Sequence, residues 1–450
     1  MEDQTMARKR AFSARIILCA PAFAAALSAS TAHLARARSL ESDWRPIVLK
    51  GRALPQLVGT SESRLEVMAL HDGRLEPIPF QVDPVLPGGS YALSDTAHPA
   101  AADATDTLGR NDELAMMLSD LGERASAEDL PSGALEIEVF DPTPNVRRYA
   151  YIAAVPSPRR STLSHVSYDP LHERIEGETY RLTLSGDFPI ALELKADGKP
   201  SSSIVEGTEV QATAQVLVLF RIHLSAKGIR NRTLGWRGGP VRVIRRVSHS
   251  MKRFLGIQPP PVMSDEIFYP ESAEDSFSSY VPWIPRLFFS DVRARAWLDF
   301  VGMDGFAISW DDAAWLPLHT ETQRAALAAA VRDKPPDANW IALKGAGQVV
   351  IQTFMPSRDL ARLRRRLYLG RTAPTADSSR PGGGRLEIGY LITGWEELAP
   401  GMHGLDSMLI VLPDRASPEA VARQLAAPPR LSVSATSVPN RPAPAPGAQR

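Results

Sequence analysis

The sequence predicts a mainly β protein, a large antiparallel β-sandwich built as one or two lobes with a few short covering helices. Segments rich in β-branched and apolar residues recur at short spacing about a dozen times, which is typical of sandwiches and barrels. Proline is in excess at 38 residues, and this favours loops and short strands over a helical bundle. No repeat of fixed period occurs, which argues against a propeller or a solenoid.

The expected strands follow one another along most of the chain. Segments 64–70 and 75–82 flank Asp72-Gly73, a strong hairpin signal. Segments 135–140 and 149–155 are expected to pair, as are 180–184 and 190–194 around a Gly-Asp turn. Further strands are expected at 210–224 (one long strand), 241–249, 295–301, 306–310, 340–343, 348–354, 385–392 and 407–412.

Helix signals occur at a few places in the chain. Thr320 and Gln323 have the spacing of a capping box, which predicts a helix ending before Pro335. Ser417 before Pro418 predicts a second helix, with serine as the N-cap and proline at the first helical position. Two more helices are predicted, over residues 357–370 and 113–121.

The N-terminus has the order of a cleaved secretory signal. A basic segment at 6–10 precedes an apolar stretch at 16–30, and small residues close it. This apolar stretch is shorter than the ~20 residues that a membrane-spanning helix needs. We therefore expect a signal peptide at residues 1–32 and a periplasmic or secreted protein with no transmembrane span in the mature chain. An uncleaved N-terminal anchor is the alternative.

Composition indicates the organisation of the remaining chain. We expect a β-rich lobe at 33–175, a sandwich lobe with helices at 176–428, and a disordered Pro/Ala/Ser-rich tail at 429–450. The single cysteine, Cys19, falls in the predicted signal, so disulfide scaffolds and cysteine-ligated zinc are excluded from the mature chain.

Charge and absent motifs exclude several classes of function. Lys+Arg and Asp+Glu both number 51, and this balance argues against a nucleic-acid binder, which carries a basic excess. The phosphate-loop, dinucleotide-binding, nucleophile-elbow and zinc-protease motifs are all missing. The sequence carries no signal for an oligomeric state.

Tryptophan is concentrated in the C-terminal half of the chain, which holds seven of the eight residues. Aromatic faces on a β scaffold stack on sugars, while arginines and carboxylates bind hydroxyl groups. The segment Trp310-Asp311-Asp312-Ala-Ala-Trp315 is the best candidate for such a ligand site, and Arg245 is a further candidate. Core packing is the alternative for the tryptophans. Adjacent aspartates on a strand point to opposite faces, which argues against joint catalysis by Asp311 and Asp312.

Three residues are candidates for a catalytic role. His403 is flanked closely by two glycines and lies near carboxylates, so it can act as a general acid or base. His249 shares a strand face with Arg245, because their separation is even. Tyr280 is the third candidate. The alternative for His403 is a loop histidine hydrogen-bonded to the backbone.

An acidic segment around Gly109 is a candidate calcium site, with Asp103, Asp106, Asp112 and Glu113 as ligands. The EF-hand register fails, because alanines then occupy the first and third ligand positions. A capping turn formed by an Asn or Asp side chain is the favoured alternative. No other cofactor is expected.

Two resemblances concern short stretches of the chain. Segments 77–83 (PIPFQVD) and 111–122 resemble those of uncharacterised secreted bacterial β-rich proteins, and this implies no activity. Segment 239–246 (GPVRVIRR) is similar to one in sandwich proteins related to sugar mutarotases and polysaccharide lyases. That resemblance implies a carbohydrate function only where a catalytic constellation accompanies it.

These observations favour an exported, non-catalytic ligand-binding or envelope-accessory protein, with a glycan or an acidic polymer as ligand. One alternative is a carbohydrate-active enzyme, either lyase-like or mutarotase-like. Another alternative is a structural assembly partner in the cell envelope.

Overall fold

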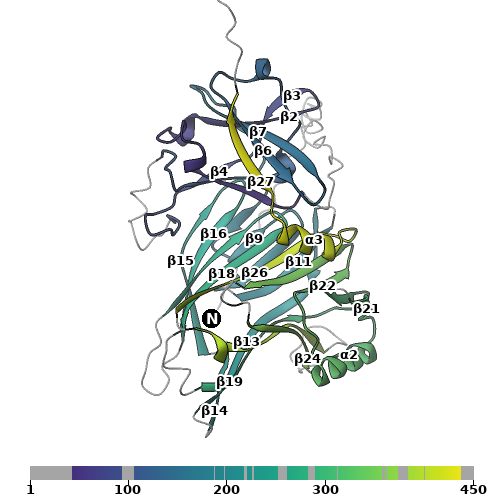
Figure 1. Ribbon diagram of the computed structural model, residues 1–450. Helices are drawn as coiled ribbons and strands as arrows, with labels where there is room; N and C mark the ends of the chain where they lie inside the picture. The colour runs from purple at the N-terminus through teal and green to yellow at the C-terminus, as the bar shows by residue number, and fades with distance from the viewer. Residues whose placement is uncertain are drawn as a thin grey trace, which may run out of the picture. The chain divides into compact units, whose positions relative to one another are not determined.

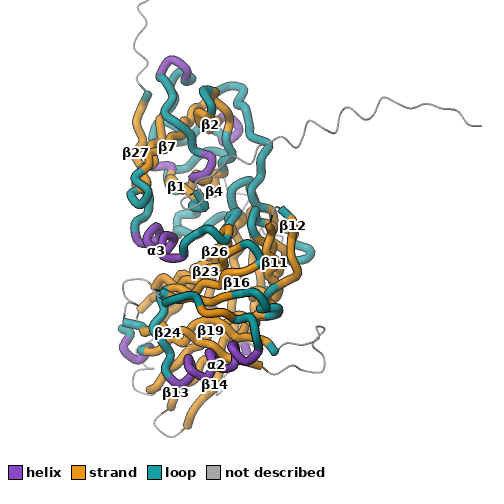
Figure 2. Tube along the Cα trace, turned by 90° about the vertical axis from the view of Figure 1, so that its right-hand side faces the viewer, coloured by secondary structure: helices purple, strands orange, loops and turns teal. Residues whose placement is uncertain are grey.

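The computed structural model describes a chain that is mainly antiparallel β-sheet. Residues 43–93, 106–186, 188–196, 198–216, 220–225, 228–251, 261–281, 289–311, 313–356, 360, 362–372, 384–399 and 401–436 are described. Contacts divide the chain into Met1–Ser39 and Leu40–Arg450, and all described residues belong to the second unit. The predicted signal peptide lies outside the described residues. Strands dominate and helices are few (Figure 2), so the predicted fold class is confirmed.

The largest sheet has nine strands, several of which are labelled in Figure 1. Its order is β15 (Ile229–Gly238), β16 (Val243–Met251), β17 (Val262–Phe268), β18 (Ser272–Val281), β26 (Gly401–Pro413), β23 (Gln348–Pro356), β22 (Trp340–Gly345), β20 (Ala307–Trp310) and β21 (Leu316–Pro317). All neighbours in this order pair antiparallel.

A five-stranded sheet shares the main hydrophobic core with the nine-stranded sheet. Its order is β14 (Phe220–Ser225), β13 (Val205–Val216), β19 (Phe289–Phe300), β25 (Arg385–Thr393) and β24 (Arg364–Thr372). Val243 and Phe268 of the larger sheet belong to one buried cluster with Leu298, Leu367 and Ile388 of the smaller one. Two sheets that bury alternate residues against each other form a β-sandwich.

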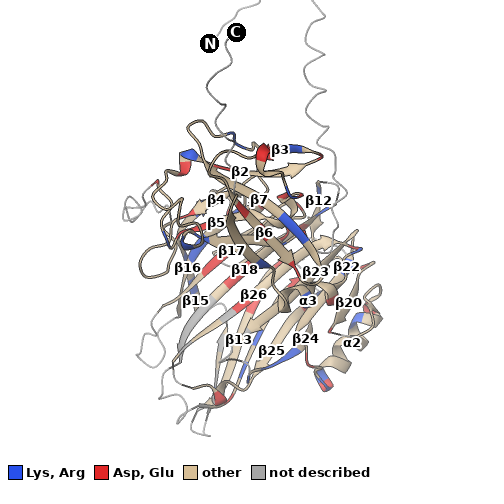
Figure 3. Cartoon of the chain, turned by 45° about the horizontal axis from the view of Figure 1, so that its top comes forward, with Lys and Arg blue, Asp and Glu red and all other residues tan. Residues whose placement is uncertain are grey.

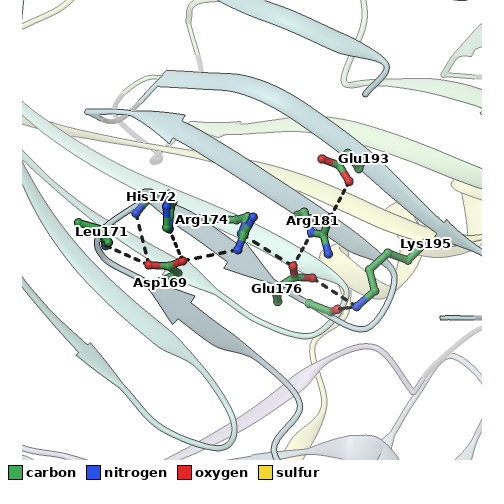
Figure 4. Close-up of polar contacts among 9 residues, drawn as sticks. Asp169, Leu171, His172, Arg174, Glu176, Arg181, Glu193 and Lys195 are labelled. Carbon is green, nitrogen blue, oxygen red and sulfur yellow. Dashed lines mark hydrogen bonds and ion pairs between the residues drawn. The ribbon is translucent and has the colours of Figure 1, made fainter. Parts of the chain in front are cut away.

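A second five-stranded sheet contributes one of its faces to the same core. Its order is β12 (Lys199–Ser203), β11 (Phe188–Ala196), β10 (Tyr180–Ser185), β9 (Arg174–Glu176) and β8 (Ser167–Asp169). Leu182 and Leu192 point to the core. The opposite face carries a ladder of ion pairs, in which Arg181 contacts Glu176 and also Glu193 at 3.0 Å (Figure 4).

Two further sheets pack around a core of their own. A three-stranded sheet has the order β1 (Pro46–Lys50), β5 (Glu113–Met117) and β4 (Gln81–Asp83). A five-stranded sheet has the order β27 (Arg430–Ala435), β6 (Leu135–Asp141), β7 (Val146–Ala154), β2 (Leu65–His71) and β3 (Arg74–Pro77). Ile47, Leu114, Val67 and Ile137 are buried together between them.

Strand β27 corrects the prediction of a disordered tail from residue 429. Residues 430–435 pair with β6 over their whole length. Leu431 and Val433 alternate with serines in this strand. Val433 packs against the hydrophobic cluster that contains Ile47 and Ile137. The alternation of apolar residues with serine is only a few residues long, and the Pro/Ala-rich composition of the surrounding tail outweighed it in the sequence analysis. The boundary predicted between the lobes near residue 175 stays a prediction.

The local signals at three strand pairs and two helices are confirmed. Asp72 and Gly73 have φ angles of 50° and 74°, as the tight turn between β2 and β3 requires. The two predicted capped helices are α2 (Glu321–Asp333) and α3 (Pro418–Ala426). The expected pairs β6–β7 and β10–β11 also form. No helix among the described residues has the length and apolar character needed to cross a membrane.

Three sequence predictions are wrong. Residues 364–372 form strand β24 instead of the end of a helix, because Leu367 and Leu369 alternate with outward residues and the strand pairs fully with β25. Segment 113–121 is strand β5 followed by a 3-10 turn, since a short apolar run can suit either element. Segment 210–224 reverses direction, with Val216 opposite Phe220, and contributes to two strands.

The capping box of α2 gives a direct stability prediction. The Thr320 hydroxyl accepts from the Gln323 amide (3.2 Å), and the Gln323 side chain accepts from the Thr320 amide (3.0 Å). Thr320→Ala is expected to lower the free energy of unfolding by about 1 kcal/mol. Denaturant unfolding measures the loss. The control Thr322→Ala, at an exposed position inside the helix, should leave stability unchanged or slightly raised. Equal losses in both variants would rule out a role for the cap.

Candidate functional site

The predicted ligand residues do not form a single site. Trp310 ends β20 and packs partly against the main core. The Asp311 carboxylate accepts from the backbone amides of Asn339 (2.8 Å) and Trp340 (3.2 Å), which fixes the start of β22. Trp315 is 37 % exposed. Asp312 lies outside the described residues.

Arg245 lies far from these tryptophans in the sheet, with five strands between β16 and β20. Its side chain is fully buried, and one terminal nitrogen donates to the Gly186 carbonyl (2.7 Å) and the Thr233 hydroxyl (2.9 Å). A second nitrogen lies 3.0 Å from a carboxylate oxygen of Glu266. These contacts show that Arg245 forms a buried ion pair with Glu266 inside the protein.

The predicted catalytic residues lie on separate strands. His249 is on β16, where its ring contacts the Ser264 hydroxyl (2.9 Å). His403 lies within β26 and not in a loop, and its Nε2 donates to the Ala399 carbonyl (2.7 Å). Tyr280 belongs to β18, but its side chain lies outside the described part of the structure. The catalytic roles of these residues stay predictions.

The acidic segment around Gly109 forms a turn. The Asp112 carboxylate accepts from the amides of Gly109 (2.6 Å) and Val85 (2.9 Å). Glu113 accepts from the Tyr91 hydroxyl (2.8 Å) and also contacts Arg242. These contacts match the capping-turn alternative, although a strand follows in place of a helix.

The remaining predicted calcium ligands contribute little to a site. Asp106 is exposed, and Asp103 lies outside the described residues. Across the described part of the chain, no three side chains of ligand type gather around one point. The structural calcium ion therefore stays a prediction, because the described side chains form no cluster that could hold it.

The stretches that carry the two resemblances meet in a buried ionic cluster. Arg242 donates from Nε to Asp83 (2.8 Å), and Arg237 approaches the other oxygen of Asp83 (3.1 Å). Arg242 also donates to Glu113 (2.9 Å), and Gln81 accepts from the Arg242 amide (3.1 Å). Arg242 is 1 % exposed and Asp83 is fully buried, so the cluster is structural.

Acidic residues of β17, β18 and β26 form a second group of charges (Figure 3). Burial raises the pKa of Glu274 to about 7, against the nearby charge of Arg242, and Asp406 raises it further. Asp265 is neutralised by Arg246 at 2.6 Å. Asp265 and Asp406 lie in one row of cross-strand partners. This row has no aromatic ring, and it consists of Arg246, Asp265, Ser276, Asp406 and Met355.

The strongest candidate site is the outer face of the sheet β14–β13–β19–β25–β24, the side turned away from the core. Inward leucines and isoleucines alternate with the outward residues on these strands. Register places the outward residues in two neighbouring rows. The first row is Gly207, Asp299, Glu387 and Gly370, and the second is Glu209, Trp297, Gly389 and Tyr368.

The second row presents aromatic rings. The ring centroids of Trp297 and Tyr368 lie 5.1 Å apart at an interplanar angle of 46°. Gly389 lies between them, and a Cβ there would come within 2.0 Å of a backbone oxygen of β19. The exposed Arg295 places its guanidinium 5.4 Å from the Tyr368 ring centroid. Trp297 is 5 % exposed and packs against the ring of Tyr368, which is half-buried.

The first row presents two carboxylates in different environments. Glu387 accepts hydrogen bonds from the hydroxyls of Tyr368 (2.7 Å) and Thr372. Asp299 accepts from the indole nitrogen of Trp297 (3.0 Å). Burial raises the pKa of Asp299, and the charge of Glu387 adds to this rise while the Trp297 hydrogen bond opposes it. The face therefore combines aromatic surface, two carboxylates and a guanidinium.

Most of these residues were not among the sequence candidates. Trp297 was counted with the tryptophans, but Asp299, Glu387 and Tyr368 were missed. The alternation in Arg295–Ala–Trp–Leu–Asp299 indicates that arginine, tryptophan and aspartate share one face. The predicted helix over 357–370 concealed Tyr368, because only a strand brings its side chain beside Glu387.

Similarity to known proteins is found with solved structures and not with family models or curated sequences. No protein-family model matches the sequence, and no curated protein matches it. One similar solved structure is an alpha-mannosidase from Enterococcus faecalis V583, with a TM-score of 0.47 and 9% identity, covering 88% of this chain and 45% of that one. Another is a protein in the glycosyl hydrolase family 38 from Enterococcus faecalis, with a TM-score of 0.46 and 8% identity, covering 88% and 46%. This chain thus spans less than half the length of either protein.

Proposed function

We propose that this protein binds a glycan on the outer face of the sheet β14–β13–β19–β25–β24. One observation carries the proposal: the half-buried Tyr368 lies beside Glu387 and the exposed Arg295 on the outer face of the sheet, with the buried Trp297 and Asp299 next to them. The apolar face of a sugar ring stacks on an aromatic ring. Carboxylates and guanidinium groups make strong, directional hydrogen bonds to neighbouring hydroxyls.

The charges on this face favour a neutral glycan over an acidic polymer. Arg293 is paired with Asp291 at 2.7 Å. Arg295 shares the face with Glu209, Asp299 and Glu387. An acidic polymer requires a surplus of cations, because its repeated charges must be neutralised. Register also places Arg364, Arg366 and Arg385 on this face, and two of them have carboxylate partners: Arg385 lies 3.1 Å from Glu206 and Arg366 lies 3.5 Å from Asp337. The described arginines of the face are therefore largely balanced by carboxylates.

The proposal includes export to the cell envelope or beyond. The basic segment 6–10, the apolar stretch 16–30 and the small residues after it support this address. A glycan ligand fits the address, because polysaccharides are abundant outside the cytoplasm. A purely structural role in envelope assembly has no comparable supporting observation.

Binding is tested with variants of the outer face. We expect Tyr368→Ala to weaken binding about tenfold or more, since a lost stacking contact contributes about 1.4 kcal/mol or more. Calorimetric titration with a panel of neutral oligosaccharides measures affinity, and circular dichroism checks that the variant folds. Arg295→Gln, at an exposed position, should also weaken binding without affecting the fold.

Trp315→Ala is the matched control, because it removes an exposed aromatic ring from a different sheet edge. It should bind as the wild type does. Binding that Trp315→Ala abolishes and Tyr368→Ala leaves intact would move the site to the β20–β21 loop. No binding of any oligosaccharide would overturn the proposed function.

A further inference from the structure

Strand β27 forms an exposed edge of its sheet. It pairs with β6 on one side, and no other described strand pairs with it on the other side. Figure 2 shows it at the margin of its group of strands. All of its residues except Val433 are exposed. A free edge of this kind presents backbone N–H and C=O groups to which another extended chain can hydrogen-bond.

The two longest edge strands have features that oppose such pairing, whereas β27 has none. Strand β15 has a register shift at 233–235 and carries the exposed Arg230 and Arg232. Strand β24 is covered by the segment 336–338, which forms backbone hydrogen bonds with it. Bulges, charges and coverage are the usual protection of sheet edges. The register of β27 with β6 is unbroken, the strand contains no proline, and its one charged residue is Arg430 at its start.

The hydrogen-bond pattern shows which backbone groups face the free edge. The Thr436 amide donates to the Ala134 carbonyl (3.2 Å), and these two residues continue the register of β27 with β6. Successive residues of an antiparallel strand alternate between bonding to the partner strand and pointing away from it. The even-numbered residues of β27 therefore bond to β6, whereas the N–H and C=O groups of Leu431, Val433 and Ala435 point to the free edge.

The sequence of this strand is symmetric about Val433. The segment from Leu431 to Ala435 (LSVSA) has the order apolar, serine, valine, serine, apolar in either direction. Antiparallel pairing with a second copy of itself places Val433 opposite its own copy, each Leu431 opposite an Ala435, and each Ser432 opposite a Ser434. The residues that exchange hydrogen bonds across this pair are then the ones whose backbone groups point to the free edge.

We propose that two copies of this chain associate through β27, paired antiparallel about a twofold axis at Val433. The pairing joins two five-stranded sheets into one continuous sheet. A twofold interface uses the same patch on both subunits, which is what a self-complementary strand provides. The inference is independent of the proposed glycan binding, because it concerns a different sheet.

Side chains support the same register. Leu431 is 38 % exposed, and the residues of β6 opposite Leu431, Val433 and Ala435 all belong to a buried apolar cluster. A partner strand continues this apolar face, so the exposed Leu431 gains apolar cross-strand neighbours. Arg430 lies opposite Thr436 in this register, so no like charges meet across the pair.

The dimer is expected to be weak, because one short strand pair buries less surface than a standard stable interface. We expect a Kd between about 1 μM and 1 mM. Sedimentation velocity of the full chain over this range of concentration measures the equilibrium between monomer and dimer.

Ala435→Pro tests the hydrogen bonds of the free edge. Proline removes an N–H that points to the partner and places its ring between the two strands, while pairing with β6 does not use this N–H. We expect the Kd to rise about tenfold or more. Ser432→Ala is the matched control, because it changes an exposed side chain on the opposite face of the strand and should leave the Kd unchanged. Circular dichroism and urea unfolding check that both variants fold.

Single cysteines test the register in a Cys19→Ser background, which removes the one native cysteine. Hydrogen-bonded opposite residues have Cα atoms about 5.5 Å apart, a distance that a disulfide spans. Val433→Cys should therefore form a disulfide-linked dimer under mild oxidation, seen on a non-reducing gel. Ser434→Cys is the matched control, because its two copies are diagonal neighbours about 7–8 Å apart, too far for a disulfide without backbone movement.

Several outcomes would overturn the inference. One is a chain that stays monomeric up to about 1 mM and gives no cross-link in Val433→Cys, which would leave the free edge to a strand of a different protein. Another is a folded Ala435→Pro that dimerises with the wild-type Kd. A cross-link in Ser434→Cys that equals the one in Val433→Cys would also contradict the proposed register. If Ala435→Pro fails to fold, the cysteine variants decide the question, because they keep every backbone N–H of the strand.

Discussion

Asp83→Asn is expected to lower the free energy of unfolding by about 3–5 kcal/mol. Asp83 is fully buried, and each of its oxygens contacts a different arginine, Arg242 at 2.8 Å and Arg237 at 3.1 Å. A neutral amide leaves the buried guanidinium of Arg242 with Glu113 as its remaining carboxylate. An under-compensated charge in a low-dielectric interior is strongly destabilising. Urea unfolding monitored by tryptophan fluorescence measures this loss.

Glu138→Gln is the control for the buried cluster. Glu138 forms a 3.0 Å ion pair with Arg147, whose side chain is 59 % exposed. Exposed pairs of this kind contribute about 0–1 kcal/mol. A loss in Asp83→Asn no larger than the loss in Glu138→Gln would show that the cluster adds no stability beyond an ordinary surface pair.

The stability of the protein is expected to fall between about pH 6.5 and pH 10 because of His165. This side chain is 1 % exposed and lies between Asp120 (2.7 Å) and Glu178 (2.6 Å). Burial alone would lower its pKa, but hydrogen bonds to both carboxylates and their charges raise it to about 10. Because folding raises the pKa of His165, the protonated side chain stabilises the folded state. This stabilisation is complete below the pKa of the unfolded chain, about 6.5, and is lost as the pH rises through the folded-state pKa of about 10.

The expected size of the effect is on the order of 4 kcal/mol across this pH range. Unfolding free energies at several pH values between 6 and 10 measure it, and His165→Gln should remove most of the pH slope. His172→Gln is the control, because His172 is 62 % exposed although it also contacts an aspartate. Parallel pH profiles for the wild type and His165→Gln would contradict the prediction.

Much of the local structure was predictable because it depends on neighbours in the sequence. The Asp72-Gly73 hairpin and the caps at Thr320 and Ser417 depend on a few consecutive residues, and all three form as expected. The error at β24 has the opposite cause. Ser357 resembles a helix start, but pairing with β25 over nine positions determines the conformation of residues 364–372.

The candidate site was not predictable because its rows cross strands that are distant in the sequence. Gly207, Asp299, Glu387 and Gly370 come from β13, β19, β25 and β24, and the sheet order alone makes them neighbours. Alternation within each strand indicates which side chains share a face. Alternation does not indicate which strands are neighbours in the sheet. For this reason Trp310 and Trp315, which are close together in the sequence, were chosen as site residues over Trp297.

The partnership of β27 with β6 has a consequence for biosynthesis. Strand β6 ends at residue 141 and β27 begins at residue 430, so 288 residues must be translated between them before the first residue of the partner strand is made. At about 5–20 residues per second this delay is roughly 15–60 seconds. Throughout that time one edge of β6 has no backbone partner, and the sheet β27–β6–β7–β2–β3 cannot be completed until β27 has been synthesised. During synthesis the unpaired edge is open to pairing with a strand of another chain, and the late arrival of β27 removes this risk of aggregation.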